Sequence, residues 1–77
     1  MKTVNIKDEF IKLGQALKLA GVVMSGVDAK FIIQDGMVKV NGQTETQRGK
    51  KLYNGDTFEY EGNEFVIKSV SGLNDNQ

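Results

Sequence analysis

Cysteine and histidine are both missing from this sequence of 77 residues. Without cysteine the chain has no disulfide and no thiolate for a metal, and without histidine it lacks the other common metal ligand. A chain of this length buries only about 60% of the surface that its unfolded form exposes. We therefore expect the fold to depend on apolar packing alone, with no cofactor.

Long apolar runs are missing as well, so no segment is expected to span a membrane. Residues 1–5 include one lysine, but no apolar stretch or small-residue cleavage site of the secretory kind follows them. A cytoplasmic location is the default expectation. The chain also has no serine-centred elbow motif and no glycine-rich phosphate loop, and it is too short to enclose a reaction away from water. It is predicted not to be an enzyme and to have no small-molecule substrate.

The charges balance overall but are distributed unevenly. Ten basic and ten acidic residues give a net charge of zero. Residues 1–55 contain nine basic and five acidic residues, a balance of +4, whereas residues 56–77 contain one and five, a balance of −4. This asymmetry is typical of a neutral protein with a basic binding face, and it is also compatible with complementary charges inside the fold.

Two helices are predicted in the first half of the chain, after a short strand or extended lead-in over residues 2–6. From Asp8 onward the period changes, and five apolar residues fall within an arc of about 80° at 100° per residue, which predicts a helix. They are Ile6, Phe10, Leu13, Leu17 and Ala20, and Gly21 is expected to end this helix. A second helix is expected to begin at Ser25, whose hydroxyl would accept a hydrogen bond from the Asp28 amide, and to end at Gly36.

The second helix has two unlike sides. Ala29, Ile32 and Ile33 are expected to join Phe10, Leu13 and Leu17 in the core. The opposite side is expected to carry Val27, Lys30, Phe31 and Gln34.

The second half of the chain is predicted to form strands. Residues 37–40 alternate, and Asn41-Gly42 favours a type I′ hairpin turn, in which both positions take positive φ. The remaining expected segments are a return strand over 43–46, a basic loop over 47–51, turns at 54–56 and 61–63, and strands over 57–60 and 64–70. The prediction is an α+β fold: two adjacent helices followed by a small, mostly antiparallel sheet. It forms a single domain over residues 1–70, with a frayed tail over 71–77.

Several short motifs follow one another in a characteristic order. They are Lys12-Leu13, Gly21, Ser25, Ala29-Lys30, Gly36, Val38-Lys39-Val40-Asn41-Gly42 and Gly55-Asp56. This ordered set resembles the S4-like RNA-binding domain, also called the alpha-L fold. The runs Leu17-Lys18-Leu19, Ser25-Gly26, Ala29-Lys30 and Glu45-Thr46 are most similar to stand-alone bacterial S4-domain proteins of the YaaA/YbcJ type.

The resemblance implies a module that docks on structured RNA, with ribosomal RNA as a candidate. The RNA would lie across the helix pair and the adjoining hairpin, and the positions carried over are Lys12, Ser25, Lys30 and Lys39. Many S4 domains have arginine after the serine that opens the second helix, where this chain has Gly26. Positions 31 and 34, often polar or basic in the family, are Phe31 and Gln34. The loop residues Arg48, Lys50 and Lys51 are expected to compensate, with Lys18 on the flank.

Each of these residues also has a plainer explanation. Ser25 could contact phosphate or only cap its helix, and Gly26 could admit a phosphate or relieve a crowded turn. Lys30 could be a solvated lysine and the basic loop an ordinary charged loop, although Gly49 would let that loop mould to a nucleic-acid backbone. Phe31 could stack on an unpaired base, or pack on the N-terminal strand or on a second copy of the chain.

Four carboxylates in the second half, at Asp56, Glu59, Glu61 and Glu64, are expected to form a solvated edge and not a metal site, because strand alternation scatters them. Two functions therefore remain open. The first is RNA binding through the basic residues; the second is a protein adaptor that uses Phe31 and the acidic edge. The adaptor gains if Lys30, Lys39 and the 48–51 loop do not share one surface.

Overall fold

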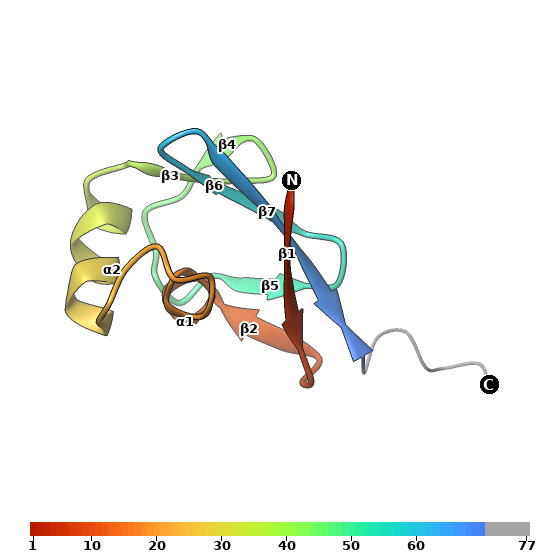
Figure 1. Cartoon of the computed structure of the whole chain (residues 1–77). Helices are drawn as coiled ribbons and strands as arrows, with labels where there is room; N and C mark the ends of the chain where they lie inside the picture. The colour runs from red at the N-terminus through yellow and green to blue at the C-terminus, as the bar shows by residue number, and fades with distance from the viewer. Residues whose placement is uncertain (71–77) are drawn as a thin grey trace.

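A mixed five-stranded sheet, a separate two-stranded ribbon and two short helices make up the computed structural model of this chain, which describes residues 1–70 (Figure 1). In chain order the elements are β1 (Lys2–Ile6), β2 (Phe10–Lys12), α1 (Leu13–Leu19), α2 (Gly26–Gln34), β3 (Val38–Val40), β4 (Gln43–Thr44), β5 (Lys51–Tyr53), β6 (Thr57–Tyr60) and β7 (Asn63–Ser69). The predicted tail, residues 71–77, lies outside the described residues.

The sheet has the strand order β1-β7-β6-β3-β4, and β2 pairs with β5 apart from it. Among the strands of residues 1–70, only the pairing of β1 with β7 is parallel; the other four strand pairs are antiparallel. The predicted α+β class and mostly antiparallel sheet are thus confirmed. Strand β1 occupies the predicted lead-in over residues 2–6, and the predicted element order needs one change, because the unpredicted strand β2 also precedes the helices.

The core lies where the helices meet the sheet. Leu13, Ala16 and Leu17 follow helical spacing and are buried, so α1 presents one apolar side inward. Ala29 and Ile33 do the same for α2. The sheet and ribbon contribute Val4, Ile6, Val38, Val40, Leu52, Phe58, Phe65 and Ile67. Ile32, which we expected in the core, is only half-buried against it.

Both helices end as predicted, at glycines. After α1, Gly21 has φ +81° and its amide donates to the Lys18 carbonyl oxygen at 3.0 Å, while the Val22 amide donates to the Leu17 carbonyl oxygen at 3.2 Å. This is the paired hydrogen-bond pattern of a Schellman motif, which glycine favours because it adopts positive φ without strain. Gly36 ends α2 in the same way, at φ +76°.

The start of the first helix was predicted wrongly. Residues 10–12 form β2, which pairs with β5, and α1 begins only at Leu13. Phe10 is consequently half-buried on the ribbon and does not belong to the core. Strand β5 was itself missed, because Lys51 had been assigned to the loop.

The hairpin after α2 was predicted correctly in type. Asn41 and Gly42 both take positive φ, +51° and +86°, as a type I′ turn requires. The return strand β4 is shorter than predicted, and β7 begins and ends one residue earlier, at Asn63 and Ser69. Within residues 1–70 no helix is long and apolar enough to cross a bilayer.

Candidate nucleic-acid interface

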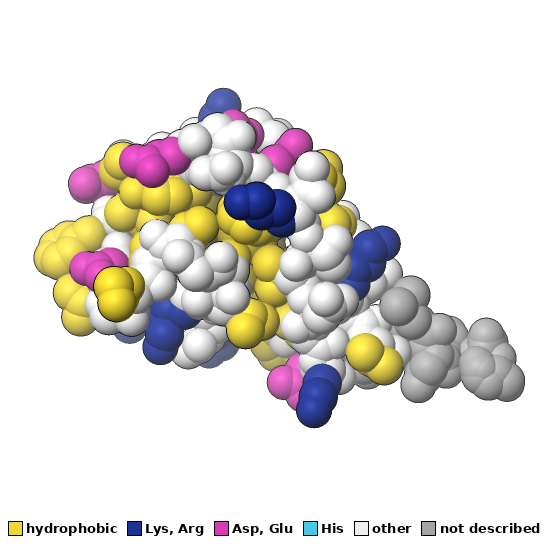
Figure 2. Space-filling view, viewed as in Figure 1, with side chains coloured by type: hydrophobic (Ala, Val, Ile, Leu, Met, Phe, Trp, Pro, Cys, Tyr) yellow, Lys and Arg dark blue, Asp and Glu magenta, His cyan; other side chains and the backbone are white. Residues whose placement is uncertain are grey.

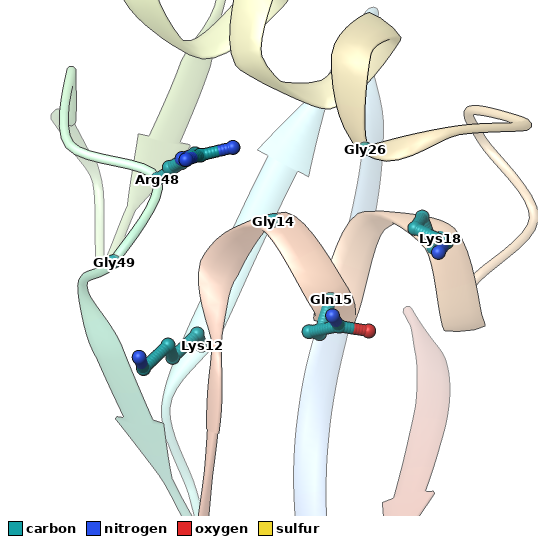
Figure 3. A pocket seen from close by; sticks show the side chains of 7 residues that line it. All are labelled: Lys12, Gly14, Gln15, Lys18, Gly26, Arg48 and Gly49. Atoms are coloured by element: carbon teal, nitrogen blue, oxygen red, sulfur yellow. The ribbon is translucent and has the colours of Figure 1, made fainter.

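A groove of about 260 Å³ lies between α1, the start of α2 and the loop that precedes β5. Its lining is formed by Lys12, Gly14, Gln15, Lys18, Gly26, Arg48 and Gly49. Three of these side chains are cationic and none is acidic. In Figure 3 the Arg48 side chain extends from the loop toward the start of α2, with Gln15 and Lys18 along α1. Four predicted RNA-binding residues (Lys12, Lys18, Gly26 and Arg48) are therefore brought together.

Backbone hydrogen bonds hold the basic loop against the beginning of α1. The Leu13 amide donates to the Lys50 carbonyl oxygen at 2.8 Å, and the Gly14 amide donates to the Arg48 carbonyl oxygen at 3.0 Å. Two of the amides at the start of α1 are thereby satisfied, although Lys12 in the N-cap position provides no side-chain cap. The loop is thus attached to α1 on both sides of Gly49.

The start of α2 forms the other wall of the groove. The Asp28 amide donates to the Ser25 hydroxyl oxygen at 3.1 Å, which confirms Ser25 as the N-cap. A Cβ placed on Gly26 would meet nothing within 4 Å, and the φ of Gly26 lies outside the left-handed region. Crowding therefore does not explain this glycine. The wall is backbone open to an approaching group, with amides at the positive end of a nine-residue helix.

Lys30 and Gln34 extend the same side of α2. Both are exposed, and they follow Gly26 at steps of four residues, which places the three along one stripe of the helix. They adjoin the groove without lining it.

Phe31 belongs to a different surface. It is 60% exposed, beside the exposed Met24 and Val27, and it borders a shallow depression together with Asp28, Ile32 and other residues. In Figure 2 hydrophobic side chains are accordingly visible over α2 at the left of the molecule. This apolar patch (Met24, Val27 and Phe31) is separate from the lining of the basic groove.

Lys39 also lies apart from the groove. It is exposed on β3, where its register partner on β6 is Glu59, whose own partner on β7 is Glu64. Residues paired in register point to the same side of a sheet, so Lys39 stands in a row with two glutamates. Of the three parts whose convergence was to decide between RNA and protein binding, the loop lines the groove, Lys30 adjoins it and Lys39 lies apart. The position of Lys39 counts in favour of the adaptor.

The remaining basic residues follow the loop into β5. Lys50 is exposed next to Gly49. Lys51 is the register partner of Lys12 across the β2–β5 ribbon, and its Nζ lies 4.7 Å from the centre of the Phe10 ring. The basic surface thus extends from the groove onto the ribbon, and Lys12 belongs to both.

The acidic residues of the second half form no metal site within residues 1–70, where no group of three or more potential ligands was found. Asp56 has a structural role: its carboxylate accepts hydrogen bonds from the Tyr53 amide at 2.7 Å and from the Asn41 side-chain amide at 3.2 Å.

Sequence reasoning missed Gln15 and Gly14 as groove residues, and it placed Gly49 in the basic loop without making it a contact residue. Gln15 had a usable signal, because it lies three residues before Lys18 and therefore on a neighbouring position of the helix surface. The other two line the groove only because the loop bonds to α1, a long-range contact that no local pattern reveals.

With this geometry established, the chain can be placed among known proteins. The S4 domain family matches residues 4–68. This chain belongs to the S4 domain family. Stand-alone S4-domain proteins of this kind are non-catalytic, in agreement with the sequence-based prediction.

Two relatives are particularly informative. A Bacillus subtilis protein named "Probable ribosome maturation protein RlbA" is 48% identical over 59 residues, covering 77% of this chain and 83% of that protein. YbcJ of Escherichia coli is 39% identical over 61 residues, covering 79% of this chain and 87% of YbcJ. The solution structure of YbcJ, described as revealing an αL motif involved in RNA binding, matches with a TM-score of 0.68 at 35% identity over 88% of this chain and 87% of that one. The predicted S4-like, alpha-L fold is confirmed.

Proposed function

We propose that this protein binds structured RNA without catalysing a reaction, and that the basic groove between α1, α2 and the 48–49 loop contacts the phosphate backbone. The observation that carries the proposal is the convergence of Lys12, Lys18 and Arg48 from three segments onto one groove with no acidic lining. Cations that line one groove repel one another, and an anion bound among them offsets this repulsion. A phosphate backbone supplies such anions.

Besides its positive charge, the groove has walls that are suited to binding a phosphate. Arg48 can form two parallel hydrogen bonds to phosphate oxygens. Opposite it, the open backbone at Gly26 offers amide donors at a helix start. Lys30 and Gln34 would extend the contact along α2 to a neighbouring phosphate, and Lys50 would add charge beside the loop. Contacts of this kind recognise the shape of an A-form helix, whose base edges are hidden in a narrow major groove.

Ribosomal RNA is the proposed class of ligand, and the cytoplasm is the proposed location of the protein. The support is the name of the relative RlbA, which refers to ribosome maturation, and the description of the αL motif of YbcJ as involved in RNA binding.

A protein adaptor is the second candidate, and the exposed apolar patch formed by Met24, Val27 and Phe31 favours it. The two functions respond differently to reversing Glu59, Glu61 and Glu64 to lysine. RNA binding through the groove predicts equal or stronger RNA affinity for that variant, whereas an adaptor that uses the acidic edge would lose its protein partner.

The decisive experiment measures fluorescence anisotropy of a labelled, blunt-ended RNA duplex at several salt concentrations. The test variant reverses Lys12, Lys18 and Arg48 to glutamate. The matched control reverses Lys2, Lys7 and Lys68, which are exposed and do not line the groove, and so changes the net charge equally.

The parent is expected to bind with an affinity that falls steeply as salt rises, and the groove variant is expected to lose binding. Removing one phosphate contact lowers the slope of log K against log salt by about 1. The control should retain most of the affinity. A parent that does not bind the duplex, or two variants that bind equally well, would contradict the proposal.

A further inference from the structure

The β2–β5 ribbon has one side that faces the solvent and carries aromatic and basic residues together. Ile11 and Leu52 are register partners that point inward, Leu52 being fully buried and Ile11 packed on the core. Because side chains alternate along a strand, the register pairs Phe10–Tyr53 and Lys12–Lys51 share the outer side.

The aromatic pair on this side is only partly covered. The centres of the Phe10 and Tyr53 rings are 5.7 Å apart, with the ring planes inclined at 50°. Phe10 is half-buried, and the Lys51 Nζ lies 4.7 Å from its ring centre. Tyr53 is 42% exposed. Phe10 thus supports Tyr53 from one side, while part of the Tyr53 surface remains available to a ligand.

The ribbon side is continuous with the basic groove through Lys12. This residue lines the groove and is also the register partner of Lys51. In Figure 3 the Lys12 side chain leaves the end of β2 and extends toward the chain that runs from Gly49 into β5. A nucleic-acid strand that leaves the groove past Lys12 would next meet Lys51 and Tyr53.

We propose that Tyr53 is a stacking residue for an unpaired RNA base adjacent to the duplex held in the groove, with Lys51 and Lys12 contacting the phosphates that flank this base. This inference rests on the proposed function and extends it, because it specifies a junction between duplex and single-stranded RNA as the ligand. An exposed ring beside cations is suited to a nucleotide, which has an apolar base face and a negative phosphate. It is poorly suited to a purely apolar partner, which would leave two lysines desolvated.

The test compares two RNA probes: a blunt-ended duplex, and the same duplex with a single-stranded extension. Tyr53→Phe keeps the ring, and Tyr53→Thr removes it with a residue that favours strands. The matched control is Phe31→Thr, which removes an exposed aromatic ring of the apolar patch. Far-ultraviolet circular dichroism establishes that each variant is folded before binding is compared.

The parent and Tyr53→Phe are expected to prefer the extended duplex. Tyr53→Thr should weaken binding to that probe by roughly 5- to 150-fold, the effect of losing one stacked base, and should leave binding to the blunt duplex unchanged. Phe31→Thr should change neither. If Tyr53→Thr weakens both probes equally or neither, or if Phe31→Thr alone removes the preference, the inference is overturned.

A second measurement does not depend on Tyr53→Thr being folded. The sequence has no tryptophan, so Tyr53→Trp introduces a single indole. Stacking on a base should quench its fluorescence when the extended duplex is added, and the blunt duplex should quench it less. Equal quenching by the two probes would overturn the inference. Salt-sensitive, groove-dependent binding of the blunt duplex with no dependence on Tyr53 would leave the proposed function standing, whereas a parent that binds neither probe would contradict both.

Discussion

Lys12 and Lys51 are direct register partners in the antiparallel β2–β5 ribbon. Like charges in this arrangement destabilise a strand pair. Lys12 also occupies the N-cap position of α1, where the helix dipole disfavours a positive charge. Two separate contributions thus oppose a lysine at this position in the free protein, and the attraction of both lysines to a phosphate bound beside them would offset these contributions.

We therefore expect Lys12→Gln to stabilise the protein and weaken its RNA binding. The free energy of unfolding should rise by about 0.5–1 kcal/mol at low ionic strength, and the gain should shrink as salt screens the charges. Lys51→Gln is the matched variant: it removes the same repulsion but also the cation–π contact with Phe10, worth about 0.5–1 kcal/mol. Its stability should stay near that of the parent. Urea denaturation at low and high salt measures both, and a lower midpoint for Lys12→Gln would show that the lysine pair carries no cost.

Ser25 can be tested for capping and for phosphate contact separately. Ser25→Ala removes the acceptor of the Asp28 amide and should lower stability by about 1 kcal/mol. Ser25→Asp retains an acceptor and should keep the parental stability, but its negative charge should repel a phosphate at the start of α2. Parental RNA affinity in a folded Ser25→Asp variant would mean that no phosphate approaches this helix start.

Asn41 combines a positive φ with side-chain hydrogen bonds. Its Oδ1 accepts from the Thr57 amide at 2.9 Å and from the Thr57 hydroxyl at 3.3 Å. Asn41→Gly loses these bonds but adopts φ +51° without strain, whereas Asn41→Ala loses them and is strained. The alanine variant should be less stable than the glycine variant by about 1 kcal/mol. Thermal melting of the two would detect this order, and equal melting temperatures would indicate that the turn relaxes.

The features predicted correctly from the sequence are those that local chemistry determines. The Ser25 cap, the Gly21 and Gly36 helix ends and the Asn41-Gly42 turn each depend on residues within a few positions of one another. Both ends of α2 could therefore be predicted from the sequence without knowledge of any long-range contact.

Residues 10–12 show where this reasoning stops. Phe10 has helical spacing relative to Leu13 and Leu17, and a strand of three residues is too short for alternation to be recognised. Its conformation is decided by pairing with β5, some forty residues later in the sequence. Long-range pairing overrides the local periodicity here, and the same pairing creates the ribbon surface that carries Tyr53.

The candidate site could be predicted only in part, because local patterns determine some of its features and long-range pairing determines others. Helical geometry correctly placed Lys30 and Gln34 on one outward stripe of α2. Alternation on β3 correctly pointed Lys39 outward, but its neighbours depend on the strand order, which places Glu59 beside it. The local pattern thus predicted the orientation of a residue but not which residues lie beside it in the folded protein.

Lys30 and Lys39 provide the sharpest comparison between groove-specific binding and a general effect of charge. Both are exposed lysines, and reversing either to glutamate changes the net charge equally. Lys30→Glu should weaken binding of the blunt RNA duplex and lower its salt slope by about 1. Its stability should change by under about 0.5 kcal/mol, because the side chain lies outside the core.

Lys39→Glu should lower stability and leave RNA binding unchanged. It would place three glutamates in one row across β3, β6 and β7, because Glu59 and Glu64 already stand beside it. Like charges opposite each other should reduce stability by about 0.2–1 kcal/mol. RNA affinity should remain parental, since Lys39 does not line the groove. Anisotropy titration and urea denaturation of the two variants side by side measure both quantities. Equal loss of RNA affinity in the two would mean that binding follows total charge, and that the groove does not position the RNA.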